Sequence, residues 1–178
     1  YLMIPYSGSG ILSSAIGMNK AVQKVLMTEA GFLSPPYFTL NRHEWVTTDN
    51  SGFVFQKIKD KIGFPCVVKA ANQGSSIGVT MVGEESNEKL SHAIDRSFFI
   101  HRLHKSDWDS KDSEQKISFI RMLTDIREGI GIPMVITSSS SSQLISHPEE
   151  VLNQLNVIFE KGDEQAMMQS CDAESEII

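Results

Sequence analysis

The stretch GFPCVVKAANQGSSIGVTMV, residues 63–82, places two runs of strand-forming residues on either side of a loop of small residues. β-Branched residues favour strands, and glycine and serine favour turns, so the stretch predicts an antiparallel hairpin. The first strand ends on Lys69, and a Gly-Ser-Ser-Ile-Gly loop follows at 74–78. Glycine reaches positive φ, and the successive N–H groups of such a loop can bind an anion beside a lysine. The loop is therefore either a surface turn beside an exposed lysine or a phosphate-binding loop.

Helical patterns surround this hairpin. We expect a helix from Asn19, which can cap it, to Gly31, which can end it, and two more helices over 53–61 and 84–99. The apolar residues of the first helix that share one face at helical spacing are Val22, Val25, Leu26 and Ala30. This alternation predicts an α+β fold in which helices pack on a small antiparallel sheet.

The rest of the chain has a less regular pattern. Lysine and aspartate are mixed through 101–116, which predicts a surface excursion, and 162–175 is polar and predicts a mobile connection. The other expected elements are strands at 1–6 and 37–40, a helical stripe at 117–126, a strand at 132–136, a serine loop at 138–142 and a helix at 148–161. Residues 101–175 are therefore expected to be helical and irregular.

A weak internal sequence similarity links two parts of the chain. Gly63–Lys69 aligns with Gly131–Thr137, and both segments follow a helical pattern and precede a loop that contains serine. Each is then followed by a pair of glutamates and another apolar helix. Because a proline and two β-branched residues also match by chance, residues 101–175 are either unrelated or a degenerate repeat of the strand–loop–helix unit at 63–100. A true repeat would have kept the scaffold and replaced the lysine by Thr137.

Composition excludes some classes of protein. The 178 residues carry 16 Lys and Arg against 22 Asp and Glu, a formal net charge of −6. That balance argues against a general nucleic-acid binder, which shows a basic surplus. The two cysteines form no disulfide framework or metal-type spacing, and no apolar run reaches membrane-spanning length. The sequence therefore predicts neither a nucleic-acid partner nor a membrane partner.

Other candidate sites fail on their patterns. The GSG at 8–10 lacks the Gly-Lys-Ser/Thr of a P-loop and the third glycine of a dinucleotide fingerprint, so it is a strand-to-helix turn. His101 and His104 have helical spacing but lie in a polar stretch, which favours a surface role, and we expect no metal site in this chain. Lys20 and Lys24 lie one turn apart at a helix start, where a cation is unfavourable unless an anion compensates it.

Two long motifs lie in register along the chain. The first is IPYSGSGILSSAIGMNKAVQKVLMTEAGFLSPPYFTL, and the second is GFPCVVKAANQGSSIGVTMV. Together they resemble the D-alanine–D-alanine ligase branch of the ATP-grasp enzymes, with matches over residues 1–40 and 62–100. The resemblance implies four regions: the tail of a preceding N-terminal domain at 1–18, an ATP-grasp central or lid subdomain at 19–100, the insertion at 101–175, and the start of the adenine-hinge strand at 176–178.

The resemblance also implies roles for single residues. Lys20 and Lys69 match lysines that hold the phosphates of ATP. Gly74, Ser75 and Ser76 match the loop that closes over those phosphates with its backbone N–H groups. Ser75 also matches a serine beside the site of the first substrate, which makes it the candidate catalytic residue.

The family reaction implied by the resemblance is ATP-driven peptide-bond formation. ATP phosphorylates the carboxylate of one D-alanine, and the amine of a second attacks the acyl phosphate, a step of peptidoglycan precursor synthesis in the cytoplasm. Lysines, loop N–H groups and Mg²⁺ would neutralise the charge that develops. The implied ligands are therefore ATP, Mg²⁺ and D-alanine, and the parent enzyme is expected to form a homodimer.

The chain also departs from the family pattern. Asn19, Ala70 and Gln73 stand where the family has Asp, Pro and Glu, which leaves the substrates and the rate open. The family's adenine-binding acid, catalytic arginine and magnesium ligands would lie outside residues 1–178, so we expect an excised piece that is inactive alone. Two alternatives remain. One is a non-catalytic nucleotide-binding or regulatory module, and the other is an ATP-grasp ligase for different carboxylate and amine substrates.

Overall fold

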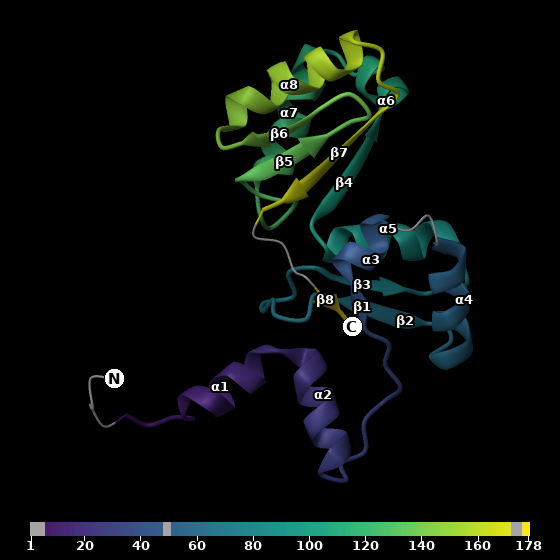
Figure 1. Cartoon of the computed structure of the whole chain (residues 1–178), viewed down its shortest axis with the longest axis vertical. Coiled ribbons are helices and arrows are strands. Elements are labelled where there is room, and N and C mark those ends of the chain that lie inside the picture. Colours follow the sequence, from purple (N-terminus) through teal and green to yellow (C-terminus); the bar gives the residue numbers. More distant parts are fainter. Residues whose placement is uncertain (1–5, 48–50, 172–175) are drawn as a thin grey trace.

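A computed structural model describes residues 6–47, 51–171 and 176–178 of the chain. The protein consists of a helical arm and two α+β units, one above the other in Figure 1. The arm contains α1 (Ile11–Met18) and α2 (Lys20–Glu29), and it leads into the first unit through an extended linker. This architecture confirms the predicted α+β class with small antiparallel sheets and helices packed on them.

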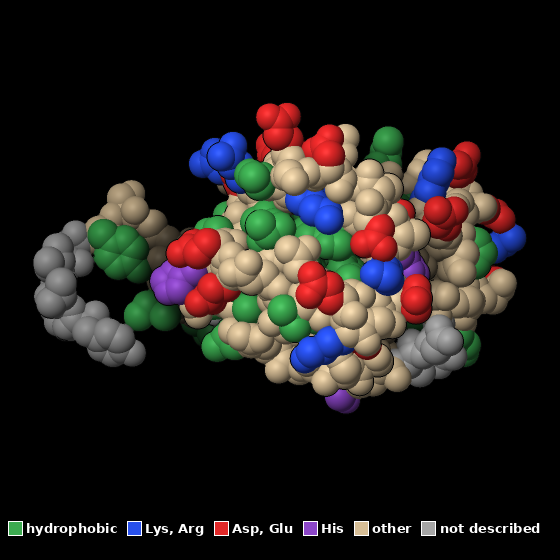
Figure 2. All heavy atoms as spheres, turned by 90° about the horizontal axis from the view of Figure 1, so that it is seen from above, with side chains coloured by type: hydrophobic (Ala, Val, Ile, Leu, Met, Phe, Trp, Pro, Cys, Tyr) green, Lys and Arg blue, Asp and Glu red, His purple; other side chains and the backbone are tan. Residues whose placement is uncertain are grey.

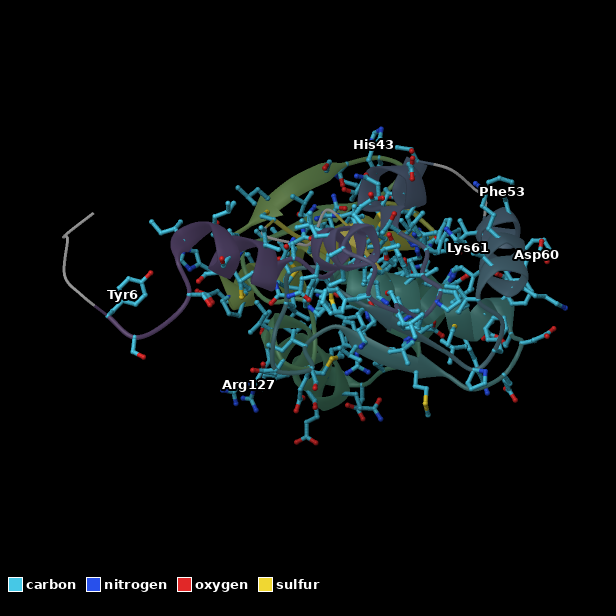
Figure 3. The ribbon with its side chains drawn as sticks, turned by 90° about the horizontal axis from the view of Figure 1, so that it is seen from below. Tyr6, His43, Phe53, Asp60, Lys61 and Arg127 are labelled. Atoms are coloured by element: carbon cyan, nitrogen blue, oxygen red, sulfur yellow. The ribbon has the colours of Figure 1, made fainter. Side chains whose placement is uncertain are left out.

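The arm meets the first unit at the start of α2. Asn19 caps this helix, since its side-chain oxygen accepts a hydrogen bond from the N–H of Val22 at 2.9 Å, and Gly31 follows its end with a φ of 80°. Both predicted helix ends are thus confirmed. The apolar face of the helix stays exposed, with 42% of Val22 and 49% of Val25 accessible. Tyr6 lies at the far end of the arm, away from both units (Figure 3).

The first unit is built around the predicted hairpin. Its strands are, in spatial order, β3 (Val79–Val82), β2 (Cys66–Lys69), β8 (Glu176–Ile177) and β1 (Leu40–Asn41). Its helices are α3 (Arg42–Thr47), α4 (Ser51–Lys61) and α5 (Asn87–Ser97). The hairpin strands are antiparallel, with Lys69 opposite Val79. Lys69 and Ile178 exchange two backbone hydrogen bonds of 2.9 Å, which join β8 to β2 and extend the sheet to β1.

The second unit holds a four-stranded antiparallel sheet. Its strands are, in spatial order, β4 (Ile100–His104), β7 (Gln165–Ser170), β5 (Met134–Thr137) and β6 (Ser142–Ile145). Its helices are α6 (Lys105–Asp109), α7 (Ser113–Thr124) and α8 (Pro148–Glu160). The chain enters this unit from α5 through β4, and it returns from β7 to β8 of the first unit (Figure 1).

Local signals explain where the long helices begin. The hydroxyl of Ser86 accepts a hydrogen bond from a backbone N–H in the first turn of α5. Asp112 and Gln115 form a reciprocal capping box at the start of α7. Pro148 occupies the first position of α8, where its missing N–H costs no hydrogen bond. The predicted helices at 53–61, 84–99 and 148–161 are confirmed as α4, α5 and α8, with small shifts of their ends.

Each unit buries its own hydrophobic core. Members of the first core include Trp45, Ile58, Val68, Ile94 and Phe98. Members of the second core include Trp108, Leu123, Ile136, Leu155 and Phe159. Ala70 and Phe99 lie in the second core although they precede the second unit, so the two units also pack on each other. The outer face seen in Figure 2 intersperses basic and acidic side chains.

Two predictions for the polar stretches are wrong. The surface excursion expected at 101–116 contains the end of β4 and all of α6, and the mobile connection expected at 162–175 contains β7, which lies between β4 and β5. Buried and accessible residues alternate along β7, where Ala166 and Met168 are fully buried. Its polar residues hid this period of two in the sequence.

Smaller differences concern strand ends. The strand expected at 37–40 begins only at Leu40, and the expected serine loop is shorter because Ser142 already begins β6. Ile126, expected in a helical stripe, lies beyond the end of α7 and is 53% exposed. The strand expected at 1–6 falls, apart from Tyr6, outside the described residues.

Candidate functional site

The predicted phosphate loop connects β2 to β3 and turns sharply at its tip. The N–H of Ile77 donates to the carbonyl oxygen of Gly74 at 3.0 Å and closes a four-residue turn. Ser75 and Ser76 at its centre have φ values of 52° and 63°, a left-handed conformation that costs a residue with a side chain about 1–3 kcal/mol. Gly78 has a φ of 65°, and a Cβ atom there would lie 3.1 Å from a neighbouring Cβ atom. The backbone of this loop is therefore locally strained.

The strained turn leaves backbone donors available. In the part of the chain that the structure describes, no hydrogen bond uses the N–H group of Ser75 or Ser76. Both residues and Gly74 are exposed. Successive N–H groups in a turn form a concavity that favours anions. The three predicted loop residues thus lie together in a geometry that suits a phosphate.

Lys69 stands at the end of β2, directly before this loop. It is exposed, and no hydrogen bond or ion pair of the described residues engages its ammonium group. Because successive side chains of a strand point to opposite faces, Lys69 shares the open face of the hairpin with Val67. Val67 lies opposite Met81, and these side chains are 46% and 73% exposed. The open face therefore combines a cation with an apolar cross-strand pair.

Lys20 reaches the same loop from α2, but its charge faces loop carbonyl groups. Its backbone N–H donates to the carbonyl oxygen of Ala71 at 3.0 Å. Its ammonium group donates to the carbonyl oxygens of Ala70 at 3.0 Å, Ala71 at 3.3 Å and Gln73 at 2.5 Å. In this structure Lys20 therefore holds the segment that leads to Gly74.

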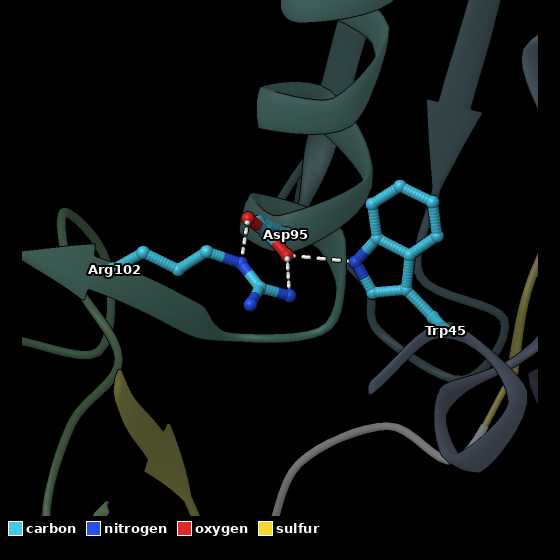
Figure 4. A network of polar contacts seen from close by, with 3 residues as sticks. All are labelled: Trp45, Asp95 and Arg102. Carbon is cyan, nitrogen blue, oxygen red and sulfur yellow. Dashed lines mark hydrogen bonds and ion pairs between the residues drawn. The ribbon is translucent and has the colours of Figure 1, made fainter. Parts of the chain in front are cut away.

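A polar network that the sequence did not reveal joins α3, α5 and β4 (Figure 4). The indole N–H of Trp45 on α3 donates to Asp95 Oδ1 on α5 at 2.7 Å. Arg102 on β4 donates to both oxygens of Asp95, from Nε at 2.9 Å and from Nη2 at 3.3 Å. This bidentate pair ties the second unit to the first. Trp45 lies fifty positions before Asp95 in the chain, so no local spacing could have indicated this contact.

The loop between β5 and β6 has a different character. The strand before it ends on Thr137 instead of a lysine, and the N–H of Ser138 donates to the carbonyl oxygen of Ser141 at 2.8 Å. The hydroxyl of Ser139 donates to Asp163 Oδ1, and that of Ser140 donates to Asp163 Oδ2 at 2.6 Å. These hydroxyl donors hold the pKa of the Asp163 carboxyl below its usual 3.8. An acid of the same chain thus already occupies this serine loop.

Two further findings concern metals and membranes. Within the described ranges, no three His, Cys, Asp or Glu side chains come together in a way that could hold a metal ion. His101 lies on β4 with its ring centre 5.3 Å from that of Phe119, and burial lowers its pKa below 6.5. No helix in the described part of the chain is both long and apolar enough to cross a membrane.

The site thus combines an α+β unit with a strained Gly-Ser-Ser loop whose geometry suits an anion. Residues 26–102 match the family model of the D-ala D-ala ligase C-terminus. The D-alanine–D-alanine ligase of Geobacillus thermodenitrificans is 37% identical over 92 residues, 52% of this chain and 25% of that protein. D-alanine–D-alanine ligase A of Salmonella typhimurium is 40% identical over 91 residues, 51% of this chain and 24% of that protein.

These matches concern one segment of the chain. Residues 26–102 are similar to D-alanine–D-alanine ligases, which confirms the resemblance inferred from the two motifs. The chain spans about a quarter of the length of the curated relatives it matches. The match ends at residue 102, just after the chain enters the second unit.

Solved structures of ligases also align with the chain. The D-alanine–D-alanine ligase of Helicobacter pylori aligns with a TM-score of 0.39 and 19% identity, over 86% of this chain and 44% of that chain. The D-alanyl-alanine synthetase A of Vibrio cholerae aligns with a TM-score of 0.45 and 15% identity, over 97% and 57%. Both TM-scores are low, and the architecture is therefore taken from the strand registers described above.

Proposed function

We propose that residues 19–100, completed by the strand at 176–178, form the ATP-binding lid of a D-alanine–D-alanine-ligase-like enzyme. The observation that carries the proposal is the strained turn at Ser75 and Ser76, whose N–H groups are available beside the unengaged ammonium of Lys69. Strain of this kind persists where surrounding structure enforces it, often at ligand-binding sites. The proposal assigns no part of the ATP-binding lid to residues 1–18 or to the insertion at 101–175.

Each part of the site has a defined task. The N–H groups of Gly74, Ser75 and Ser76 bind phosphate oxygens, and Lys69 supplies a point charge to the same oxygens. The apolar pair Val67 and Met81 offers a surface for a flat ring beside that lysine. Lys20 holds the carbonyl groups of the segment before the loop. The hydroxyl of Ser75 contacts the first substrate as the candidate catalytic group.

The chemistry of the parent enzyme follows from this site. The loop and lysines stabilise the negative charge that develops while the γ-phosphoryl group moves to the carboxylate of D-alanine, and a second D-alanine amine then displaces the phosphate. We place the Mg²⁺ ligands in other parts of the parent, and no step is assigned to the ion here. The product would serve peptidoglycan synthesis in the cytoplasm, with a homodimeric parent.

Turnover separates this proposal from other functions. The chain alone is expected to release no phosphate from ATP in the presence of D-alanine and Mg²⁺. A non-catalytic nucleotide module would bind ATP as well, but a longer protein that contains this chain would then also release none. A ligase with other substrates would release phosphate with a different carboxylate and amine pair. Phosphate release by the 178-residue chain itself would contradict the assignment of the remaining catalytic groups to other parts of the parent.

The binding site is tested by a matched pair of variants. Lys69→Ala removes the cation at the end of β2, and Thr137→Ala changes the corresponding end of β5, where no phosphate contact is proposed. We expect Lys69→Ala to weaken binding of a fluorescent ATP analogue by about tenfold or more, since one charge-assisted contact contributes about 1.5–3 kcal/mol. Thr137→Ala should leave the affinity unchanged. Equal affinities for Lys69→Ala and the unchanged chain would make Lys69 a plain surface charge.

A further inference from the structure

The two units repeat the same order of elements. The first runs β1-α3-α4-β2-β3-α5 and ends with β8, and the second runs β4-α6-α7-β5-β6-α8 and ends with β7. The spatial order of the strands is also the same, β1-β8-β2-β3 in one sheet and β4-β7-β5-β6 in the other. All these neighbours are antiparallel. The second unit is therefore nested in the first, between α5 and its last strand.

Side chains at corresponding positions make the same contact. In the first unit, Trp45 on the short helix α3 donates its indole N–H to Asp95 at 2.7 Å. In the second unit, Trp108 on the short helix α6 donates its indole N–H to Asn156 at 3.1 Å. Asp95 and Asn156 hold the same position in α5 and α8 when each helix is counted from its first residue. Both tryptophans are buried.

The correspondence extends to turns and cores. Gly63 and Gly131 precede the hairpin of each unit with φ values of 79° and 74°. The buried residues that occupy corresponding positions of the strands and helices are Leu40 and Leu103, Val68 and Ile136, Ile94 and Leu155, and Phe98 and Phe159. The pairs of glutamates noted in the sequence do not correspond, because 84–85 precede α5 whereas 149–150 lie inside α8.

We propose that residues 100–170 are a second copy of the first unit, inserted before its last strand, and that the carboxylate of Asp163 fills the anion position of this copy's loop. The first loop offers N–H groups and Lys69, whereas the second offers serine hydroxyls and has Thr137 in place of the lysine. Only the identity of the anion at the first loop rests on the proposed function. The chain accordingly has one loop that is open to an external phosphate.

The surroundings of Asp163 support an internal anion. Hydroxyl groups of Ser139 and Ser140 donate to its two oxygens, as donors in an anion site do for phosphate oxygens. A hollow of about 440 Å³ lies beside the loop, with Arg102, Thr137 and Asp163 among its lining residues. This space admits a small anion once the carboxylate is removed. The side chain of Asp163, and not the backbone of the loop, therefore keeps an external anion out of this position.

Chemical rescue tests the internal anion. Asp163→Ala is combined with Lys69→Ala, which weakens phosphate binding at the first loop. The ¹⁵N-labelled protein is titrated with inorganic phosphate, and a titration with chloride at equal ionic strength is the control. The amide signals of residues 138–141 should shift saturably with phosphate in the double variant and stay unchanged in Lys69→Ala alone. Asp163→Ser should behave like Asp163→Ala and replaces it if that variant does not fold.

Two results overturn the proposal. The first is the absence of a phosphate-specific shift at residues 138–141 in either Asp163 variant, and the second is an equal shift when Asp163 is present. Failure of the proposed function would look different, because phosphate would then leave the amides of residues 74–76 of the unmodified chain unchanged while the rescue at 138–141 persisted.

Paired substitutions test whether the two tryptophan contacts play the same role in the two units. Trp45→Phe and Trp108→Phe each remove one indole donor and should each lower the equilibrium constant for folding by about five- to tenfold. In double variants, the effect of each tryptophan should depend on its partner, Asp95→Ala or Asn156→Ala. Additive effects of Trp108→Phe and Asn156→Ala would show that the second contact stabilises nothing, and the correspondence would fail.

Discussion

Replacement of Lys20 by methionine tests what fastens the helical arm to the first unit. Methionine keeps the apolar stem but removes the three hydrogen bonds to carbonyl oxygens of the loop. One hydrogen bond to a charged group contributes about 1.5–3 kcal/mol. Because the three bonds share one half-buried ammonium group, we expect the free energy of local opening to fall by about 2–3 kcal/mol in total. That loss corresponds to opening that is about 30–150 times more frequent.

Hydrogen exchange measures this opening directly. Amides in the first turns of α2 and in the loop at 70–73 should exchange faster in Lys20→Met, while those of the second unit keep their rates. Lys24→Met is the matched control. Lys24 lies one turn further along the same helix and donates to the hydroxyl of Ser34 and the carbonyl oxygen of Pro35, within the arm and its linker. Equal rates at 70–73 in the two variants would refute the role of Lys20 in holding the loop.

Three further predictions concern stability. Since burial lowers the pKa of His101, the unfolded chain takes up its proton first, so the free energy of unfolding should fall as pH drops below 6.5; His101→Gln should flatten that part of the curve, and an unchanged curve would contradict this cause. Gly78→Ala should lower the free energy of unfolding, measured with denaturant, by about 1–2 kcal/mol, because φ is 65° and the new Cβ would lie 3.1 Å from a neighbouring Cβ atom. An unchanged free energy of unfolding would show that the loop relaxes freely. Ile94→Ala and Leu155→Ala should each lower the free energy of unfolding by about 2–5 kcal/mol. Because the two residues lie in separate cores, the two losses should add within about 0.5 kcal/mol in the double variant, and a strongly non-additive result would contradict two separate cores.

The hairpin and its loop could be predicted from sequence because their signals are local. Val67 and Val68 directly before Lys69 are β-branched, and the Gly-Ser-Ser-Ile-Gly run at 74–78 is typical of a turn. The cap at Asn19 and the stop at Gly31 are equally local, and both are confirmed. A left-handed conformation at Ser75 has no such signal, since serine rarely adopts it and only the surrounding structure imposes it.

Features that depend on distant residues escaped prediction. The sequence of β7, QAMMQS, does not alternate polar and apolar residues, and only its position between two other strands makes it a central strand. The bond from Trp45 to Asp95 joins residues fifty positions apart in the chain, and neither residue has a neighbour that suggests it. The carbonyl groups that receive Lys20 could not be identified from the lysine alone. The similarity between 63–69 and 131–137 is present in the sequence, but the full correspondence of the two units lies in the strand order of their sheets.

A titration of the ¹⁵N-labelled chain with ATP tests most directly whether the loop after Lys69 is the phosphate site. The backbone amides of Gly74, Ser75 and Ser76 should show the largest chemical-shift changes, because their N–H groups are the proposed phosphate donors. Lys69→Ala should weaken the same changes by about tenfold. Largest changes in the second unit, or none at residues 74–76 at millimolar ATP, would contradict the account.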